Sequence, residues 1–259
     1  LHEPYRRQRQ MCIRDRTYIQ ETYTLEHKSG IYNFTGGVRL SYWDYNRECI
    51  VSPRISIGFN PAFNPRLTFR FATGLYYQAP FYKEFRDTLQ DSRGNWAVRL
   101  NDRIKSQRSV HVILGSDFTF RAMDRPFKLT GEVYYKKLDR LISYEVDNVR
   151  VWYSGENNSE GYIAGLDLKL FGEFVPGVDS WLTFSLMTAK EKTASGYVPL
   201  PTEQRYSVGL FFQDYVPRFP KYRFSLKAIW SDGLPMAAPR KGRAEGYFRT
   251  PPYRRVDIG

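Results

Sequence analysis

The sequence predicts an all-β fold, an antiparallel transmembrane β-barrel of which about eleven strands are present. Three observations support this prediction. Apolar and polar residues alternate with a period of two along most of the chain, as in strands with one apolar and one polar face. Most alternating stretches run for about ten to fourteen residues, whereas soluble strands have about five or six and a tilted membrane-crossing strand about 9–11. The connections between them alternate between short and long.

The alternation is clearest from Leu67 onward. Leu67, Phe69 and Phe71 fall on one face, and Arg70 and Gly74 fall on the other. The same pattern recurs in later stretches, so we expect hydrogen-bonded strands throughout the chain. The expected strands cover about 18–27, 34–43, 48–59, 66–77, 109–121, 126–138, 160–174, 179–190, 203–215, 220–231 and 253–259.

The connections add a second signal. Short turns rich in Pro, Gly or Asp are expected at 60–65, 122–125, 175–178 and 216–220. Long connections are expected at 78–109, 139–159, 191–202 and 232–252. Short turns at one rim and long loops at the other are the pattern of an outer-membrane barrel. One connection, 44–47, is short where this rhythm predicts a long loop.

A soluble β-sandwich also alternates, but its strands are shorter, so strand length and loop rhythm favour the barrel. In a barrel the apolar face meets lipid and the polar face lines the lumen. We predict outward positions for Leu67, Phe69, Leu129, Val133, Leu166, Leu168, Leu226 and Ala228. We predict lumen positions for the charges of Arg39, Arg54, Arg70, Asp117, Glu132, Asp167, Lys169 and Lys227.

Aromatic residues near the expected strand ends predict girdles at the level of the lipid headgroups, where rings with a polar edge are favoured. Their preference for strands in general is the alternative explanation. The residues are Tyr42, Trp43, Tyr76, Tyr77, Tyr134, Tyr135, Trp181, Tyr222 and Trp230.

The first sixteen residues stand apart. Residues 6–16 read RRQRQMCIRDR, which resembles the in-frame translation of a common sequencing-library adapter. We therefore expect residues 1–16 to be an unstructured artefact that packs against nothing, and 17–259 to be one domain. Removing their five arginines and two acids lowers the net charge of the chain from +12 to +9. It also leaves Cys49 as the only cysteine, which excludes an internal disulfide.

No catalytic or metal-binding motif is present in the sequence: HExxH, a P-loop, GxSxG and CxxC are all missing. Glu132 and Asp167 can meet across neighbouring strands, where a lumen salt-bridge network is favoured over an acid–base pair. The basic excess lacks an RNP-like motif, so we expect no nucleic-acid partner, and a positive lumen accounts for the charge. We expect neither an enzyme nor a cofactor or metal.

Several motifs carry a family resemblance. FTGGVRLSYW at 34–43, SPRISIGF at 52–59 and PRLTFRFATGLYYQAPFYKEF at 65–85 resemble the barrel of TonB-dependent outer-membrane receptors. YIAGLDLK at 162–169 and PPYRRVDIG at 251–259 look like later strands of that barrel, in the form common among Bacteroidetes. The resemblance covers about 18–259.

The resemblance implies a 22-stranded barrel in the outer membrane of a Gram-negative cell, with an N-terminal plug and a TonB box that engages an energy-transducing complex. This chain is expected to form an open half of such a barrel, without plug or TonB box, and so not to transport by itself. The ligand would be a siderophore, cobalamin, a glycan or a similar bulky nutrient. A passive porin-like channel without a plug is the alternative, which a plug and TonB box upstream would exclude.

The long loops would capture the ligand outside the cell, and 78–109 and 139–159 are the best candidates because they are rich in Tyr, Arg, Asp and Asn. The candidate ligand-binding residues are Tyr76, Gln78, Tyr82, Arg86, Arg93, Asn95, Trp96, Arg150, Trp152, Asn157 and Asn158.

Overall fold

A computed structural model gives the structure of the chain. It describes residues 14–44, 46–81, 84, 86–90, 96–101, 103–147, 150–193, 196–216, 219–238, 242–243 and 245–259. In these ranges no helix has the length and apolarity needed to cross a membrane.

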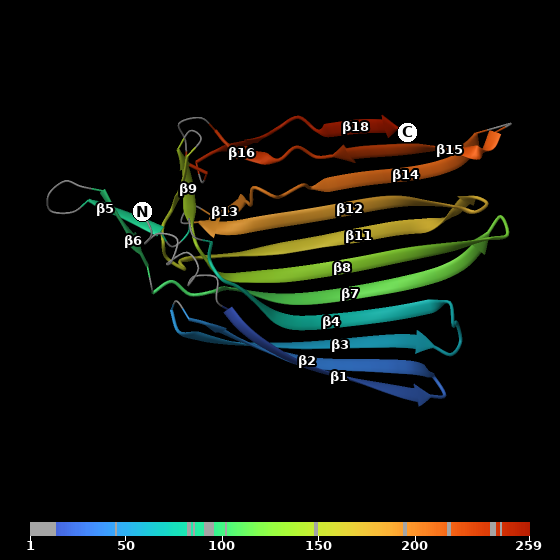
Figure 1. Cartoon of the computed structure of the whole chain (residues 1–259), viewed down its shortest axis with the longest axis horizontal. Helices are drawn as coiled ribbons and strands as arrows, with labels where there is room; N and C mark the ends of the chain where they lie inside the picture. Colours follow the sequence, from blue (N-terminus) through green and yellow to red (C-terminus); the bar gives the residue numbers. More distant parts are fainter. Residues whose placement is uncertain are drawn as a thin grey trace.

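One antiparallel sheet dominates the molecule (Figure 1). Its strands lie side by side in the order in which they occur along the chain, from β1 at one edge to β18 at the other. They are β1 (Arg14–His27), β2 (Gly30–Trp43), β3 (Glu48–Pro61), β4 (Leu67–Gln78), β7 (Gln107–Ala122), β8 (Arg125–Leu141), β11 (Ser159–Val175), β12 (Val178–Thr193), β14 (Tyr206–Val216), β15 (Phe219–Ser231) and β18 (Tyr253–Ile258). The eleven-strand expectation is confirmed.

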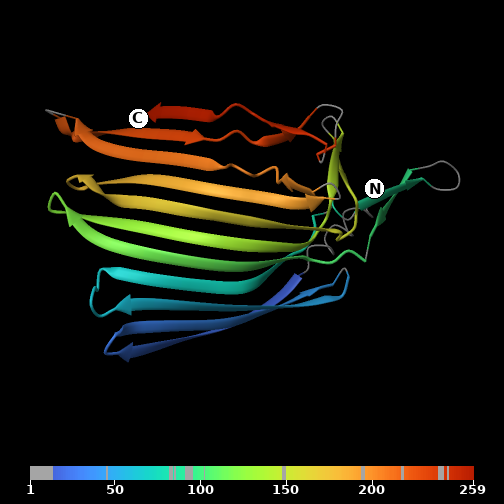
Figure 2. The ribbon, with the colours of Figure 1, turned by 180° about the vertical axis from the view of Figure 1, so that it is seen from behind.

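Shorter strands occupy the long connections, and the sequence did not predict them. They are β5 (Arg86–Gln90) with β6 (Trp96–Leu100), β9 (Tyr144–Asp147) with β10 (Arg150–Tyr153), β13 (Gly196–Pro199), and β16 (Pro235–Ala237) with β17 (Tyr247–Arg249). With three to five residues each, they are too short to show a clear alternation. Figure 2, from behind, shows them gathered at the same end of the sheet.

Several strand boundaries differ from the expectation. β8 and β11 have 17 residues each, because backbone pairing continues past their apolar stretches toward the long connections. The expected strand at 203–215 begins later, at Tyr206. Glu203 is instead buried at the end of the sheet, where its carboxylate accepts hydrogen bonds from the Ala189 backbone N–H and the Thr188 hydroxyl.

The expectation that residues 1–16 pair with nothing is wrong for Arg14–Arg16. These three residues extend β1, and their backbones pair with Ser41–Trp43 of β2. Backbone pairing needs extended geometry and free N–H and C=O groups rather than particular side chains, so a free strand edge can recruit them. Residues 1–13 lie outside the described residues, and their origin from an adapter stays a prediction.

The register separates the two faces as predicted. Leu67 lies opposite Phe118, and the row continues through Leu129, Leu170, Leu182, Leu210 and Ala228. Arg70 lies opposite Gly115, and that row continues through Glu132 and Asp167. We call these the apolar face and the polar face.

The polar face is the less exposed of the two. In β7, Val112, Leu114 and Phe118 of the apolar face are exposed, whereas His111 and Asp117 of the polar face are partly covered. Side chains crowd together on the inner side of a curved sheet and spread apart on its outer side. The sheet therefore curves toward its polar face.

Aromatic rings form two bands on the apolar face. Near the short turns, the ring centroids of Tyr32 and Phe59 are 4.6 Å apart, and those of Phe120 and Phe127 are 5.7 Å apart. Near the long connections, Tyr162 packs against Tyr135 and Tyr197 at 6.2 and 5.6 Å. Phe127 and Tyr135 are eight residues apart in β8, about 26 Å along a strand, which suits a membrane's apolar band.

Some aromatic residues expected in a girdle lie on the polar face instead. They are Trp43, Tyr76, Tyr134 and Trp181, whose register partners belong to that face. Trp43 is only 4% exposed and packs with Ile104 and Ile142, so it forms a small core beneath the long connections. An aromatic residue at a strand end belongs to a girdle only if its side chain also points to the apolar face, which depends on whether its position in the strand is odd or even.

The short 44–47 connection also has a structural explanation. The Asn46 amide donates to the Ile104 carbonyl at 2.7 Å, and the Ser106 backbone N–H donates to the Glu48 carboxylate at 2.9 Å. The end of the β4–β7 connection therefore lies against this turn and covers the rim where a long loop was expected.

Candidate functional site

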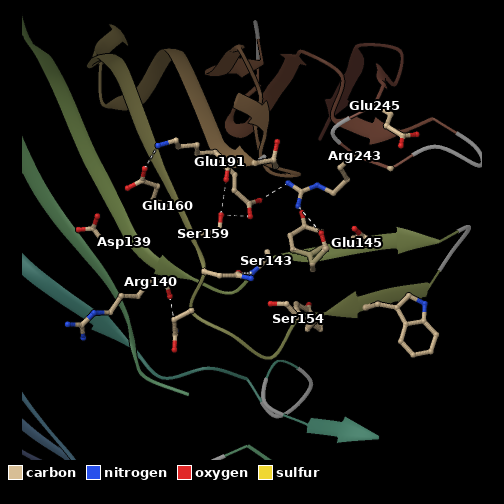
Figure 3. A pocket seen from close by; sticks show the side chains of 18 residues that line it. Asp139, Arg140, Ser143, Glu145, Ser154, Ser159, Glu160, Glu191, Arg243 and Glu245 are labelled. Atoms are coloured by element: carbon tan, nitrogen blue, oxygen red, sulfur yellow. Dashed lines mark hydrogen bonds and ion pairs between the residues drawn. The ribbon is translucent and has the colours of Figure 1, made fainter. Parts of the chain in front are cut away.

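A cavity of about 1270 Å³ opens at the end of the sheet that carries the long connections. Its walls come from the β8–β11 connection, the start of β11, the end of β12 and the β15–β18 connection (Figure 3). It exceeds the roughly 300–1000 Å³ that is usual for pockets that bind drug-sized molecules. The lining is mixed, with Tyr144, Trp152 and Tyr153 as its aromatic members.

Arg243 joins three segments at this cavity. Its guanidinium lies 2.8 Å from the Glu191 carboxylate, and its central carbon lies 3.9 Å from the centroid of the Tyr144 ring. The Ser159 hydroxyl donates to the same carboxylate at 2.8 Å. Figure 3 shows Arg243, Glu191 and Ser159 pointing toward one another. The ion pair is buried, with side-chain exposures of 11% for Arg243 and 3% for Glu191.

This contact connects the β8–β11 connection to the β15–β18 connection above the polar face of β12, because Glu191 pairs with Gly161 of the polar row. Burial raises the pKa of Tyr144 to about 12. Its hydroxyl is buried and makes no hydrogen bond within the described part of the chain. Burial also raises the pKa of Tyr153, and the charge of Glu84 adds to this shift.

A second ionic cluster anchors the β15–β18 connection beside β14. The Asp232 carboxylate lies 2.6 Å from the Arg205 guanidinium and 3.2 Å from that of Arg249, and Arg249 also pairs with Glu203. Glu203 and Asp232 are 3% and 4% exposed. Hydrogen bonds from Arg205 hold the pKa of Asp232 below its usual value.

The predicted ligand residues of the 139–159 loop have different roles. Trp152 lines the cavity with 57% of its surface exposed. Asn157 and Asn158 also line it, but their side chains form hydrogen bonds with backbone groups. The Asn157 amide donates to the carbonyls of Lys105 and Arg140 and accepts from the Lys105 backbone N–H, and Asn158 accepts from the Ser143 N–H.

Among the other predicted ligand residues, Tyr76 and Gln78 do not line this cavity. Tyr76 stacks on His111 at 4.1 Å, and the Arg54 guanidinium lies 4.4 Å from its ring centroid. Gln78 ends β4 opposite Gln107. Arg86, Trp96 and Arg150 belong to the hairpins β5–β6 and β9–β10. Tyr82, Arg93 and Asn95 lie outside the described residues.

The eight predicted lumen charges all lie on the polar face. Arg39 lies opposite Ser52, which is two residues from Arg54 and therefore on the same face of β3. Lys169 lies opposite Thr183, and Thr183 lies opposite Gly209. Lys227 lies opposite Phe211, which is two residues from Gly209 and therefore also on the polar face. Arg70 forms salt bridges with Asp117 at 3.3 Å and Glu132 at 3.0 Å. Glu132 is therefore part of a salt-bridge network. Among the residues described, no cluster of His, Cys, Asp and Glu could hold a metal ion.

Sequence reasoning missed Arg243, Glu191 and Tyr144. Glu191 and Arg243 are 52 residues apart, and no motif links them. The only available signal was the length of the 232–252 connection, which was large enough to reach across the rim.

Comparison with known proteins places this geometry in a family. The family model described as TonB dependent receptor-like, beta-barrel matches residues 5–259, a range that begins within the segment that we predict to be adapter-derived. No curated protein sequence matches the chain. Among solved structures, a mutant of the ferric enterobactin receptor (PfeA) from Pseudomonas aeruginosa is similar in fold, with a TM-score of 0.61 and 14% identity. The similarity covers 95% of this chain and 37% of that one, so the chain spans little more than a third of that receptor. The chain belongs to the TonB-dependent receptor β-barrel family.

Proposed function

We propose that the chain is part of the barrel of an outer-membrane receptor that imports a bulky nutrient with energy supplied through the TonB complex. One observation carries this proposal. The sheet curves toward a charged face, carries an apolar face with two aromatic bands, and holds a large cavity among the long connections. In this arrangement the apolar face contacts lipid, the polar face lines the lumen around a plug, and the long connections lie outside the cell.

The charges of the cavity narrow the ligand class. Five carboxylates and three cationic side chains are among its described lining residues. Asp139, Glu160 and Glu191 are paired with Arg108, Lys137, Lys192 and Arg243, whereas Glu145 and Glu245 are exposed and form no salt bridge in the described ranges. These two carboxylates disfavour a polyanion, so a neutral or cation-bearing nutrient such as a glycan or cobalamin suits the cavity better than an anionic siderophore. The motifs at 162–169 and 251–259 support a source among the Bacteroidetes.

Uptake by cells that carry the complete gene tests the proposal. The probes are a labelled oligosaccharide, cobalamin and a ferric siderophore. We expect uptake of one of them to be lost when the gene is deleted and also when TonB is removed. Uptake that depends on the gene but continues without TonB would favour a passive porin-like channel.

Loop variants test whether the cavity holds the ligand. Trp152→Ala removes an exposed ring from the cavity wall, and Tyr222→Ala removes a ring of 67% exposure at the opposite end of the sheet as a matched control. We expect weaker ligand binding to cells with the first variant alone. An equal loss of ligand binding in both variants would show that the ligand does not bind in this cavity.

A further inference from the structure

A row of basic side chains crosses the polar face near the end of the sheet that carries the long connections. Arg54 of β3 lies opposite Gly74 of β4, which lies opposite His111 of β7. His111 in turn lies opposite Lys136 of β8. We call Arg54, His111 and Lys136 the basic row. Lys136 directly follows Tyr135 of the aromatic band near the long connections, so the basic row lies close to this end of the lumen.

The basic row has no carboxylate partner in the part of the chain that the structure describes. The Arg54 guanidinium forms no salt bridge there, and its buried Nε atom makes no hydrogen bond. The Lys136 ammonium contacts an aromatic ring and forms no salt bridge in the same ranges. A buried N–H without an acceptor costs free energy, and neighbouring like charges repel each other. An anion at the basic row would relieve both costs.

The charges of the same face are balanced nearer the short turns. Arg70 pairs with Asp117 at 3.3 Å and with Glu132 at 3.0 Å, and Lys128 pairs with Asp117 at 3.3 Å. This network contains two cations and two carboxylates, so it has no excess charge to offer a further anion. The attraction for an anion is therefore local to the basic row.

Aromatic rings fix the side chains of the basic row. The Arg54 guanidinium lies 4.4 Å from the centroid of the Tyr76 ring, and the His111 ring stacks on the same tyrosine at 4.1 Å. The Lys136 ammonium lies 5.3 Å from the centroid of the Tyr134 ring. Cation–π contacts hold a cation without consuming its N–H donors. The basic row is therefore ordered before an anion binds, which lowers the entropy cost of binding.

The basic row also lies close to the cavity among the long connections. Lys136 is two residues before Leu138, which lies opposite Gly161, and Gly161 lies opposite Glu191 of the cavity wall. Two residues along a strand correspond to about 7 Å, and the two strand spacings from β8 to β12 correspond to about 10 Å. A nutrient in the cavity can therefore place one of its groups at the basic row.

We propose that the basic row binds a single carboxylate or phosphate group of the imported nutrient. Guanidinium and ammonium groups form strong, charge-assisted hydrogen bonds with both oxyanions. The nutrient is then neutral or cationic where it faces the free carboxylates of the cavity, and it carries one oxyanion, as a glycan with one acidic sugar does. This inference deepens the proposed function and rests on its placement of the polar face in the lumen.

The test follows the histidine rings of the full chain by nuclear magnetic resonance, after refolding in a nonionic detergent. The chain is titrated at constant pH with glucuronate, glucose 6-phosphate and glucose, which share a sugar ring and differ in the oxyanion. The sequence has three histidines, and His27 ends β1 near the short turns, so it is an internal control. We expect both anionic sugars to shift the His111 signal, which His111→Gln identifies, and glucose to shift neither signal.

Paired variants locate the site. R54Q/K136Q removes one arginine and one lysine from the basic row, and R70Q/K128Q removes the same residue types from the balanced network. Salt at about 0.15 M limits long-range effects of these changes to about 8 Å. Because charge-assisted hydrogen bonds are lost, we expect R54Q/K136Q to bind the anionic sugars at least about tenfold more weakly. We expect little change in R70Q/K128Q. Lys136→Gln alone provides a milder variant if the double change prevents folding.

The opposite results overturn the inference. Equal weakening in both double variants, or equal shifts with glucose, would show that the basic row is not an oxyanion site. The complete receptor is then titrated in the same way, and retained binding supports a group of the nutrient. Binding to the chain but not to the complete receptor would show that a carboxylate of another segment occupies the basic row, which overturns the nutrient assignment. TonB-dependent uptake is measured separately, so normal uptake without anion binding at the basic row overturns this inference alone.

Discussion

Arg243 shows how one side chain can organise the end of the molecule that carries the long connections. It pairs with Glu191 and covers Tyr144, so two connections that are distant in sequence share one buried contact. Arg243→Ala would leave the Glu191 carboxylate buried without its partner. Breaking a buried ion pair from one side costs about 3 kcal/mol or more. We expect faster amide hydrogen exchange in β9 and β16.

Arg255→Ala provides the control for that experiment. Arg255 also pairs with a carboxylate, that of Asp257 at 2.9 Å, but both side chains are exposed, at 58% and 43%. Exposed pairs contribute little to stability. Exchange in β9 and β16 should stay unchanged in this variant, and equal acceleration in both variants would contradict the role of Arg243.

Asp232 makes the β15–β18 connection sensitive to acid. Hydrogen bonds from Arg205 and the charge of Arg249 hold the pKa of Asp232 below its usual value in the folded chain, although burial acts in the opposite direction. A carboxyl with a lowered folded pKa contributes stability above its unfolded pKa, near 4, and that stability is lost as the pH falls through the folded pKa. We expect the protection factors of the amides in β16 and β17, which compare exchange with the intrinsic rate at each pH, to fall below about pH 4. Asp232→Asn should show lowered protection factors already at neutral pH and lose this acid response.

At the scale of elements, the two faces of β11 differ by a single step along the strand. Leu168 belongs to the apolar face and Lys169 to the polar face. An arginine on a lipid-facing strand costs roughly 2–4 kcal/mol near the membrane midplane. Leu168→Arg should therefore lower the unfolding free energy in phospholipid micelles by about that amount. Lys169→Gln should change it little, and the reverse order would show that the faces are assigned wrongly.

At the scale of the whole molecule, the sheet is open. In the described chain β1 pairs only with β2, and β18 pairs only with β15. An unpaired backbone group in lipid costs several kcal/mol, and in water such edges and the apolar face promote aggregation. We expect the chain expressed alone to form inclusion bodies, or to bind detergent without resisting heat during electrophoresis. A heat-resistant monomer with hydrogen-bonded terminal strands would indicate a small closed channel instead.

Much of the fold could be read from the sequence because its signal is local. Alternation with a period of two identified the strands from Leu67 to Gln78 and from Tyr162 to Leu170, and strand parity assigned Arg70 and Glu132 to one face. The spacing of Pro-, Gly- and Asp-rich turns separated the rim of short turns from the rim of long connections. Neither signal depends on contacts between distant segments.

The tertiary structure alone decided the site. Curvature of the sheet toward its polar face brings the connection after β8 near the connection after β15, so that Arg243 can reach Glu191 and Tyr144. The tertiary structure also showed that the Asn157 amide donates hydrogen bonds to the backbone carbonyls of Lys105 and Arg140. A period of two sets the direction of each side chain relative to its own strand. Contacts between loops depend instead on the curvature of the whole sheet, to which all of its strands contribute.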